Sequence, residues 1–427
     1  MTLSETMAFI QEVSWQGCRP GLERITDLMH RIGDPQKELR YIHITGTNGK
    51  GSTAAMLATI LCKAGYTVGL FTSPHLRFYN ERIKINGQDI SDEDLCAAAE
   101  VVKPAVDKMD TIPSEFERFT AMAFWSFRQR KCDIVVLEVG LGGALDSTNV
   151  ICAPEVAVIT NISLEHTEYL GSTISEIAAT KSGIIKSGSD VVLCGQSQEV
   201  EQEVRSACAS HDCQLCITDH SQIERYGGNL GGQLLRYRQR DDIHLQLLGT
   251  YQCENAAVAL DTVDVLRRRG WTITEDAVYK GLAETIWPGR FEVLHQKPLF
   301  LVDGAHNPNG MEELVNCLNQ YLPGKKLTFV IGVMGDKNYL DMVSCLVHNA
   351  KQFITVTPDN PRALPSNKLK QAIESVFPNS VISAGTVKNG VSRALLHASE
   401  DDVFCACGSL YMVGEIRDFF ERINNQS

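Results

Sequence analysis

A glycine-dense turn between an apolar strand and a helix constrains this chain more than any other stretch. Residues 41–44 are of strand length, residues 46–51 read GTNGKG, and from Ser52 onward apolar side chains recur on one helical face. Glycines let backbone N–H groups converge on an anion, and the helix N-terminus adds unpaired donors and its dipole. The stretch therefore predicts a phosphate-binding loop within an α/β fold.

This loop departs from the standard G-x-x-x-x-G-K-[ST] spacing, because Ile44 stands where the first glycine is expected and Gly51 follows the lysine. Lys50 is still placed to meet terminal phosphates, and a following hydroxyl could reach Mg²⁺. A solvated lysine on a glycine-rich turn is the alternative interpretation. We predict that nucleotide is bound by Gly46, Thr47, Asn48, Gly49, Lys50, Gly51, Ser52 and Thr53.

Length and composition are those of a globular protein with more than one domain. The 427 residues exceed a single core of about 100–200 residues, and 44% are apolar and 22% charged. The net charge of −12 argues against nucleic acid or an anionic membrane as a partner. No apolar run approaches the ~20 residues of a membrane span, and the N-terminus lacks a signal pattern.

Cysteine usage bears on the compartment. The fourteen cysteines lie mostly in apolar segments, which is typical of buried thiols in a reducing environment. Cys208, His211, Cys213 and Cys216 cluster, but they lack a second ligand pair at zinc-finger spacing, so we expect no structural zinc there. We expect a cytoplasmic monomer.

Apolar runs that end in polar residues alternate with helical patterns, which indicates parallel sheets covered by helices. In the first part of the chain, strands are predicted at 41–44, 67–71, 134–137, 156–160 and 191–195. An amphipathic helical region that includes Trp15 is predicted in 1–40, and further helices at 50–64, 92–108, 114–130, 173–181, 252–269 and 274–284. Hairpins are predicted at 77–91 and 227–232, and the rest of 200–247 is weakly patterned.

The segment IWPGR at 286–290 interrupts this pattern and is the predicted domain boundary. Beyond it the rhythm restarts, with strands predicted at 299–303, 328–333, 353–357 and 403–407. We therefore predict an α/β protein of two domains: a P-loop ATPase-like parallel sheet with flanking helices at 1–287, and a Rossmann-like α/β domain at 288–427.

Polar residues follow three neighbouring strands of the first domain. Ser73 follows the strand at 67–71, Glu138 ends the next, and His166 follows the one after it. In open α/β sheets ligands bind at the carboxyl ends of the strands. Carboxylate and hydroxyl oxygens suit Mg²⁺, whereas imidazole is an unusual ligand for it. From these residues alone, Glu138 is either a metal ligand or the buried partner of a base, and His166 is more simply structural.

Seven motifs resemble, in order, those of the folate branch of the Mur ligase superfamily, the folylpolyglutamate synthases and dihydrofolate synthases. They are GTNGKGST at 46–53, TSPHL at 72–76, EVGLGG at 138–143, YQCENAAVA at 251–259, PGRFE at 288–292, DGAHNP at 303–308 and GSLYMVGE at 408–415. The resemblance implies an ATP-dependent ligase that forms an acyl phosphate on a folate carboxylate and couples it to L-glutamate.

The resemblance also implies roles on the nucleotide side. Ser73, Glu138 and His166 would hold metal; two Mg²⁺ ions are implied, and a monovalent cation such as K⁺ is compatible with them. Lys181 matches the lysine that the superfamily carries as a carbamate. The remaining assignments are Asn255 near the adenine, Arg290 at the γ-phosphate and Asp303 at the ribose.

On the acceptor side, His306 would lie near the incoming amino acid and Ser409 near glutamate. The catalytic set is then Lys50, Lys181, Arg290 and His306. Phe116, Asp146 and Ser147 fall where the family holds its pteroyl group. Three positions depart from the family pattern: Ala144 replaces an arginine, Ser147 an alanine and Glu165 an aspartate.

Other functions remain as alternatives. One is a ligase for a different carboxylate, such as a muramyl peptide. A P-loop ATPase or kinase has no need of DGAHNP and GSLY, and a non-catalytic regulator has no need of Lys50, Glu138 and Lys181. The partners expected are ATP, L-glutamate and a folate or dihydropteroate, with no nucleic acid and no membrane.

Overall fold

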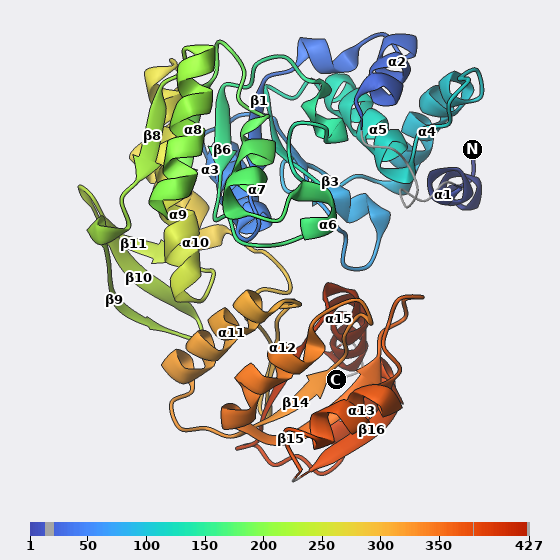
Figure 1. Ribbon diagram of the computed structural model, residues 1–427, viewed down its shortest axis with the longest axis vertical. Helices are drawn as coiled ribbons and strands as arrows, with labels where there is room; N and C mark the ends of the chain where they lie inside the picture. Colours follow the sequence, from blue (N-terminus) through green and yellow to red (C-terminus); the bar gives the residue numbers. More distant parts are fainter. Residues whose placement is uncertain (13–20, 379, 425–427) are drawn as a thin grey trace. The chain divides into compact units, whose positions relative to one another are not determined.

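The computed structural model describes residues 1–12, 21–378 and 380–424, so Trp15 lies outside the described residues. The chain forms two compact units (Figure 1). The first contains Met1–Tyr226, Leu235–Leu245 and Cys253–Thr285. The second contains Gly227–Leu234, Gln246–Gln252 and Ile286–Ser427.

The first unit is built on an eight-stranded sheet. Its strands are β1 (Tyr41–Thr45), β2 (Val68–Phe71), β3 (Ile83–Ile85), β4 (Gln88–Asp89), β5 (Ile134–Glu138), β6 (Val156–Ile159), β7 (Asp190–Cys194) and β8 (Leu215–Thr218). Their spatial order is β4-β3-β2-β5-β1-β6-β7-β8. In this order β2, β5, β1, β6, β7 and β8 pair in parallel. The strands β3 and β4 extend the sheet beyond β2 by antiparallel pairing. The carboxyl ends of β1, β2, β5 and β6 therefore lie along one edge.

Helices separate these strands. They are α1 (Leu3–Gln11), α2 (Glu23–Arg31), α3 (Lys50–Lys63), α4 (Asp92–Val106), α5 (Glu115–Gln129), α6 (Thr167–Leu170), α7 (Ile174–Ser182), α8 (Gln198–His211), α9 (Thr250–Arg268) and α10 (Glu275–Glu284). Short 3-10 turns are η1 (Pro35–Glu38), η2 (Tyr79–Arg82), η3 (Ser147–Val150) and η4 (His220–Gln222). Ser91, Ser114, Thr173 and Thr274 cap the helices that follow them, each accepting a backbone N–H through its hydroxyl.

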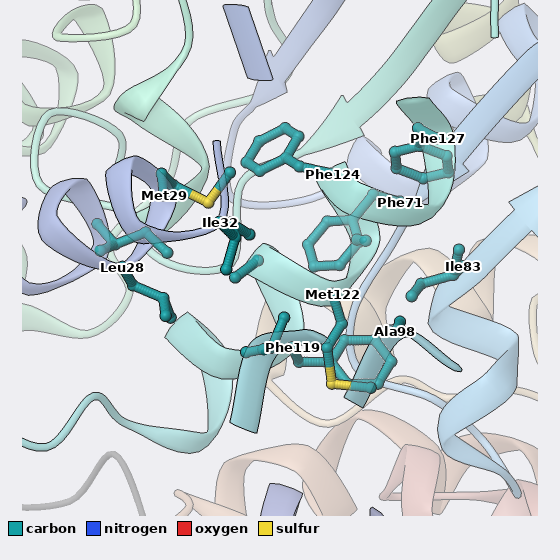
Figure 2. Packing of buried hydrophobic residues seen from close by; sticks show 14 of the residues in the cluster. Leu28, Met29, Ile32, Phe71, Ile83, Ala98, Phe119, Met122, Phe124 and Phe127 are labelled. Carbon is teal, nitrogen blue, oxygen red and sulfur yellow. The ribbon is translucent and has the colours of Figure 1, made fainter. Parts of the chain in front are cut away.

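One face of this sheet carries two apolar clusters. Helices α1, α2, α4 and α5 cover the first, in which Phe71, Phe119 and Phe124 pack together (Figure 2). Helices α7 and α8 cover the second, over β6 and β7. Parallel register places His43 of β1 beside Leu137 of the first cluster and Ala157 of the second. A polar side chain therefore stands at the seam between two apolar clusters.

Helix α3 differs from its predicted amphipathic form, because its side chains are buried on nearly all sides. It packs against β1, β2 and β5 and also against α10. At Gly281 of α10, a Cβ would lie 2.6 Å from the Ile60 Cα, so only glycine permits this approach of the two helices. The sequence periodicity of α3 is blurred because two partners enclose it.

Residues 200–247 are weakly patterned in sequence, yet the structure places most of α8 and all of β8 in their first part. Only Val200, Val204 and Cys208 of α8 are buried, and this narrow stripe is set among glutamates and glutamines. The predicted hairpin is present as β9 (Ile223–Asn229) and β10 (Gly232–Tyr237), which form a three-stranded sheet with β11 (Arg240–Leu245).

The second unit has a six-stranded sheet, whose strands are β12 (Glu292–Gln296), β13 (Leu299–Val302), β14 (Leu327–Ile331), β15 (Ala350–Thr357), β16 (Val381–Thr386) and β17 (Val403–Cys407). The order is β12-β13-β17-β14-β15-β16, and β12 alone is antiparallel to its neighbour. Its helices are α11 (Pro308–Tyr321), α12 (Tyr339–Leu346), α13 (Ser366–Glu374), α14 (Val387–Leu395) and α15 (Leu410–Asn424), with the turn η5 (Val347–Asn349).

The predicted α/β fold with two largely parallel sheets is confirmed, and antiparallel strands extend one edge of each sheet. Within the ranges that the structure describes, none of the helices is long and apolar enough to span a membrane.

Candidate active site

The phosphate loop lies between β1 and α3, as predicted. The Lys50 ammonium folds back over the loop and donates to the carbonyl oxygens of Gly46 (2.9 Å) and Thr47 (3.1 Å). Gly49 caps α3 with φ of 88°, in the left-handed region that favours glycine. A Cβ on Gly49 would lie 2.3 Å from the Asn255 Oδ1, so the predicted adenine-side asparagine lies directly against the loop.

The end of β6 supports the other side of the loop. The Thr160 hydroxyl donates to the Asn48 carbonyl (2.8 Å), and the Thr47 N–H donates to the Asn161 carbonyl (2.7 Å). The Ser52 and Thr53 side chains are both buried at the start of α3. The end of β6 thus holds the loop in shape.

Two of the three predicted metal ligands lie together. The Ser73 backbone N–H donates to the Glu138 carboxylate (3.1 Å), and Glu138 is buried. Their carboxylate and hydroxyl oxygens fit Mg²⁺, which proteins commonly hold through one or two carboxylates plus substrate phosphates. Among the described residues, no three His, Cys, Asp or Glu side chains are grouped to hold a metal. Phosphate oxygens would therefore have to complete such a site.

The third predicted ligand, His166, lies in a different setting. It caps the N-terminus of α6 with a positive φ of 51°, and 41% of its side chain is exposed. Its Nε2 lies 3.5 Å from a carboxylate oxygen of Glu165. The residue that departs from the family's aspartate is thus the one in contact with the histidine.

Lys181, at the end of α7, is buried against the phosphate loop rather than exposed. Its ammonium donates to the Gly46 carbonyl at 2.8 Å, so the two lysines Lys50 and Lys181 share one acceptor. Burial and the charge of Lys50 lower the pKa of Lys181 to about 7, against the opposing effects of Glu165 and Asp146. A large fraction of this amine is therefore neutral near pH 7.

The segment predicted to face the pteroyl group is held by several hydrogen bonds to Asp146. Asp146 is buried, and its carboxylate accepts from the Leu141 N–H (2.9 Å), the Thr148 N–H (3.0 Å) and the Thr148 hydroxyl (2.6 Å). Burial raises the pKa of Asp146. A Cβ on Gly140 would lie 2.6 Å from the Phe116 ring, so the structure brings Phe116 onto this segment.

Two further residues of this region have simple structural surroundings. Ala144 donates its N–H to the Thr180 carbonyl (3.0 Å), and its methyl lies against Gly183, where a Cβ would be only 2.3 Å away. Ser147 begins η3 and is half-buried.

The predicted residues of the second unit gather where β13 and β17 end. Asp303 accepts from the Phe291 N–H (2.8 Å) and the Ala305 N–H (2.7 Å), one on each carboxylate oxygen. Burial raises the pKa of Asp303, and the neighbouring Arg290 opposes that shift. His306 has its Nδ1 2.9 Å from the Gly304 carbonyl.

Ser409 belongs to the same strand-end group. Its hydroxyl accepts from the Tyr411 N–H (3.2 Å), and the preceding Gly408 donates to the Ala305 carbonyl (3.0 Å). The structure thus joins the segments that carry Arg290, Asp303, His306 and Ser409 within one unit.

Sequence reasoning left two histidines, His43 and His75, without a role. His75, within TSPHL, accepts from the Arg82 guanidinium (2.9 Å), and burial together with that charge lowers its pKa to about 3. His43 lies fully buried in β1. For His43, the available sequence signal was a histidine inside the apolar run YIHIT. For His75, it was the motif TSPHL itself.

Comparison with known proteins places the whole chain in one family. Residues 44–263 match the Mur ligase middle domain, and residues 289–410 match the Mur ligase glutamate ligase domain. The chain is 36% identical to the folylpolyglutamate synthase of Lacticaseibacillus casei over 98% of each protein. It is 37% identical to the dihydrofolate synthase/folylpolyglutamate synthase of Bacillus subtilis, over 94% of this chain and 95% of that one.

A solved relative has the same fold. The structure of Escherichia coli FolC in complex with DHPP and ADP matches with a TM-score of 0.87 and 28% identity, over 99% of both chains. The likeness therefore spans both units and all seven motifs, and this chain belongs to the folylpolyglutamate synthase/dihydrofolate synthase family of Mur ligases.

Proposed function

We propose that this protein is an ATP-dependent ligase that adds L-glutamate to a folate carboxylate through an acyl phosphate and releases ADP and phosphate. The observation that carries the proposal is the phosphate loop with Lys50 and Lys181 on one carbonyl, in a chain that also contains the glutamate ligase domain. The relatives named above support the folate and glutamate specificity.

The residues of the loop bind and orient the nucleotide in this proposal. Phosphoryl transfer depends mainly on positioning and charge stabilisation, so the N–H groups before α3 and the Lys50 ammonium would hold the terminal phosphates. Lys50 would exchange its present carbonyl acceptors for phosphate oxygens. Asn255, fixed against Gly49, would lie on the base side.

We propose two Mg²⁺ ions for this site, with Glu138 and Ser73 as protein ligands, His166 as a further one, and K⁺ as a compatible monovalent cation. Mg²⁺ neutralises charge that develops on the transferred phosphoryl group. Lys181 would act as a carbamate, because an ammonium near divalent cations is repelled and its neutral amine can react with carbon dioxide.

Residues of the second unit would contact the incoming amino acid and the nucleotide. In this proposal Arg290 meets the γ-phosphate, Asp303 the ribose, His306 the incoming amine and Ser409 the glutamate, within a domain that begins near residue 288. Phe116, Asp146 and Ser147 would face the pteroyl group. A cytoplasmic location is proposed because every cysteine among the described residues is free, and we propose a monomer.

An ADP-release assay tests the proposal. Dihydropteroate and tetrahydrofolate monoglutamate are each supplied with and without L-glutamate, and a UDP-muramyl peptide acceptor serves as the comparison. We expect ADP release that requires both a folate and glutamate, with one added glutamate detected by mass spectrometry. Release with the muramyl peptide alone, or without any acceptor, would contradict the folate assignment.

A further inference from the structure

His43 is an unusual residue for the centre of a parallel sheet. It lies in the middle of β1, fully buried, with the apolar residues Leu137 and Ala157 beside it on the same face. Each neighbour belongs to a different apolar cluster. Burying an imidazole here costs free energy unless it is hydrogen-bonded, so its partner identifies what the histidine contributes.

That partner belongs to the segment that contains Asp146. The His43 Nε2 lies 2.9 Å from the Thr148 hydroxyl oxygen, and that hydroxyl lies 2.6 Å from the Asp146 carboxylate. His43 and Thr148 have no exposed surface, and Asp146 has little. A buried chain of hydrogen bonds therefore runs from the strand before the phosphate loop to the proposed pteroyl segment.

The direction of donation along these hydrogen bonds follows from the groups at either end. The Nδ1 of His43 is buried and has no hydrogen-bond partner in the structure. A bare acceptor nitrogen in that position costs less than a buried N–H without a partner, which favours the tautomer that carries the proton on Nε2. The imidazole then donates to Thr148, and Thr148 donates to Asp146. Burial lowers the pKa of His43 to about 3, so the imidazole is neutral throughout the neutral range.

Asp146 connects this chain of hydrogen bonds to the backbone of residues 141–148. One of its oxygens accepts from the Thr148 N–H and hydroxyl, and the other accepts from the Leu141 N–H. The Thr45 hydroxyl, two residues after His43 on β1, donates to the Gly142 carbonyl (2.5 Å). The strand thus fixes residues 140–148 at two points, and the Phe116 ring packs on Gly140.

We propose that His43 and Thr148 are positioning residues that set the shape of residues 140–148, and thereby the affinity for the planar heteroaromatic acid substrate. They act through Asp146, whose oxygens are already committed to protein donors, rather than by touching substrate. This inference rests on the proposed function, because it takes the folate to bind at this segment.

The matched pair Thr148→Val and Thr148→Ser tests the inference. Valine keeps the shape and removes the hydroxyl, whereas serine keeps the hydroxyl. We expect Thr148→Val to raise KM for the folate by about tenfold, or ~1.4 kcal/mol, with KM for ATP unchanged within about twofold. Thr148→Ser should restore the wild-type KM for the folate.

Two further variants, His43→Leu and His43→Leu/Thr148→Val, complete a double-mutant cycle with Thr148→Val. If both residues act through one chain, the effect of His43→Leu should largely vanish in the Thr148→Val background. Fully additive effects, an unchanged KM for the folate in Thr148→Val, or an equal rise in KM for ATP would each overturn the inference. If Thr148→Val does not fold, Thr148→Ala and His43→Gln provide the same comparison.

The proposed function and the inference can fail separately. If the wild-type protein releases no ADP with either folate, the proposed function fails. If the wild-type protein is active and the Thr148 and His43 variants keep its KM values, only the positioning role fails. Unchanged ADP-induced stabilisation in each variant shows that the phosphate loop is intact.

Discussion

Lys181 illustrates how burial changes the chemistry of a single residue. An unfolded lysine titrates near 10.5, whereas this buried amine has a pKa of about 7. Between these values the unfolded chain binds the additional proton, so stability rises with pH across this window. Below pH 7 the full cost of burying the amine is present.

We therefore predict that Lys181→Met is more stable than the wild-type protein at pH 6.5, and that the advantage shrinks towards pH 10. Methionine fills a similar volume without the titrating amine, although it loses the bond to Gly46. Urea unfolding in buffers free of carbon dioxide measures the difference. A difference independent of pH would show that burial does not perturb this amine.

The carbamate leads to a separate prediction. Lys181→Ala should be nearly inactive and partly rescued by a high concentration of acetate, which supplies a small carboxylate in its place. Wild-type activity should fall when carbon dioxide is removed. Full activity of the alanine variant, or a free amine in a metal-bound crystal structure, would contradict the carbamate; sodium chloride at equal ionic strength is the control for acetate.

Ala144 and Ser147 are single residues that depart from the family pattern. The methyl of Ala144 lies against Gly183, so an arginine there must extend past the end of α7. We predict that Ala144→Arg with Ser147→Ala changes the preference between dihydropteroate and tetrahydrofolate without changing ATP affinity. The ratio of kcat/KM for the two substrates is the measurement, and an identical ratio in both proteins would exclude this role.

At the residue scale, the sequence motifs indicated which segments lie close together, but not which groups form hydrogen bonds with their side chains. Lys50, Lys181 and Gly46 meet, as do the segments of Asp303 and His306. The engagement of Asp303 by two backbone N–H groups was not visible in DGAHNP. One donor, Ala305, lies within the motif and the other, Phe291, lies in the segment just before β12. Residue types alone do not encode this backbone geometry.

At the scale of elements, Asp303 joins the end of β13 to the segment before β12. It accepts one N–H from each side, from Phe291 and from Ala305. Asparagine offers only one acceptor oxygen, so Asp303→Asn must leave a buried N–H unpaired. We predict a loss of ~1–3 kcal/mol in the free energy of unfolding.

Urea denaturation measures this loss, and Asp359→Asn provides a matched control. Asp359 is an exposed aspartate that follows β15 in the same sheet. Equal stability of Asp303→Asn and Asp359→Asn would show that the bonds of Asp303 contribute little.

Elements with strong patterns were predicted well. The buried strands β1, β5 and β6 lie where their apolar runs predicted, because a strand covered on both faces must be apolar throughout. Helix α8 was missed because its buried stripe is one residue wide. The antiparallel edge strand β12 was also missed, since its side chains are only half-buried.

At the scale of the whole molecule, each unit has its own apolar core. A single boundary between residues 287 and 288 does not represent the short stretches Gly227–Leu234 and Gln246–Gln252, which the contacts assign to the second unit. Such interleaving arises from long-range packing, which local sequence patterns do not report.

Separate cores lead to a prediction for thermal unfolding. We expect a calorimetric enthalpy larger than the van't Hoff enthalpy, because the units need not melt together. ADP should raise the transition of the first unit, which contains the phosphate loop, by mass action. Lys50→Ala is the control and should abolish that shift with little change in the melting of the free protein. One two-state transition in wild-type protein would contradict independent units.

The contact between α3 and α10 sets an order of events during protein synthesis. The helix that follows the phosphate loop is made early, but the partner that covers it lies more than two hundred residues later, as the ion pair between Lys63 and Glu284 illustrates. Domains generally fold as units while the chain emerges from the ribosome. This nucleotide site therefore cannot reach its final support until residue 284 has left the exit tunnel. Until then only the sheet covers α3, and its side that faces α10 stays exposed in the nascent chain.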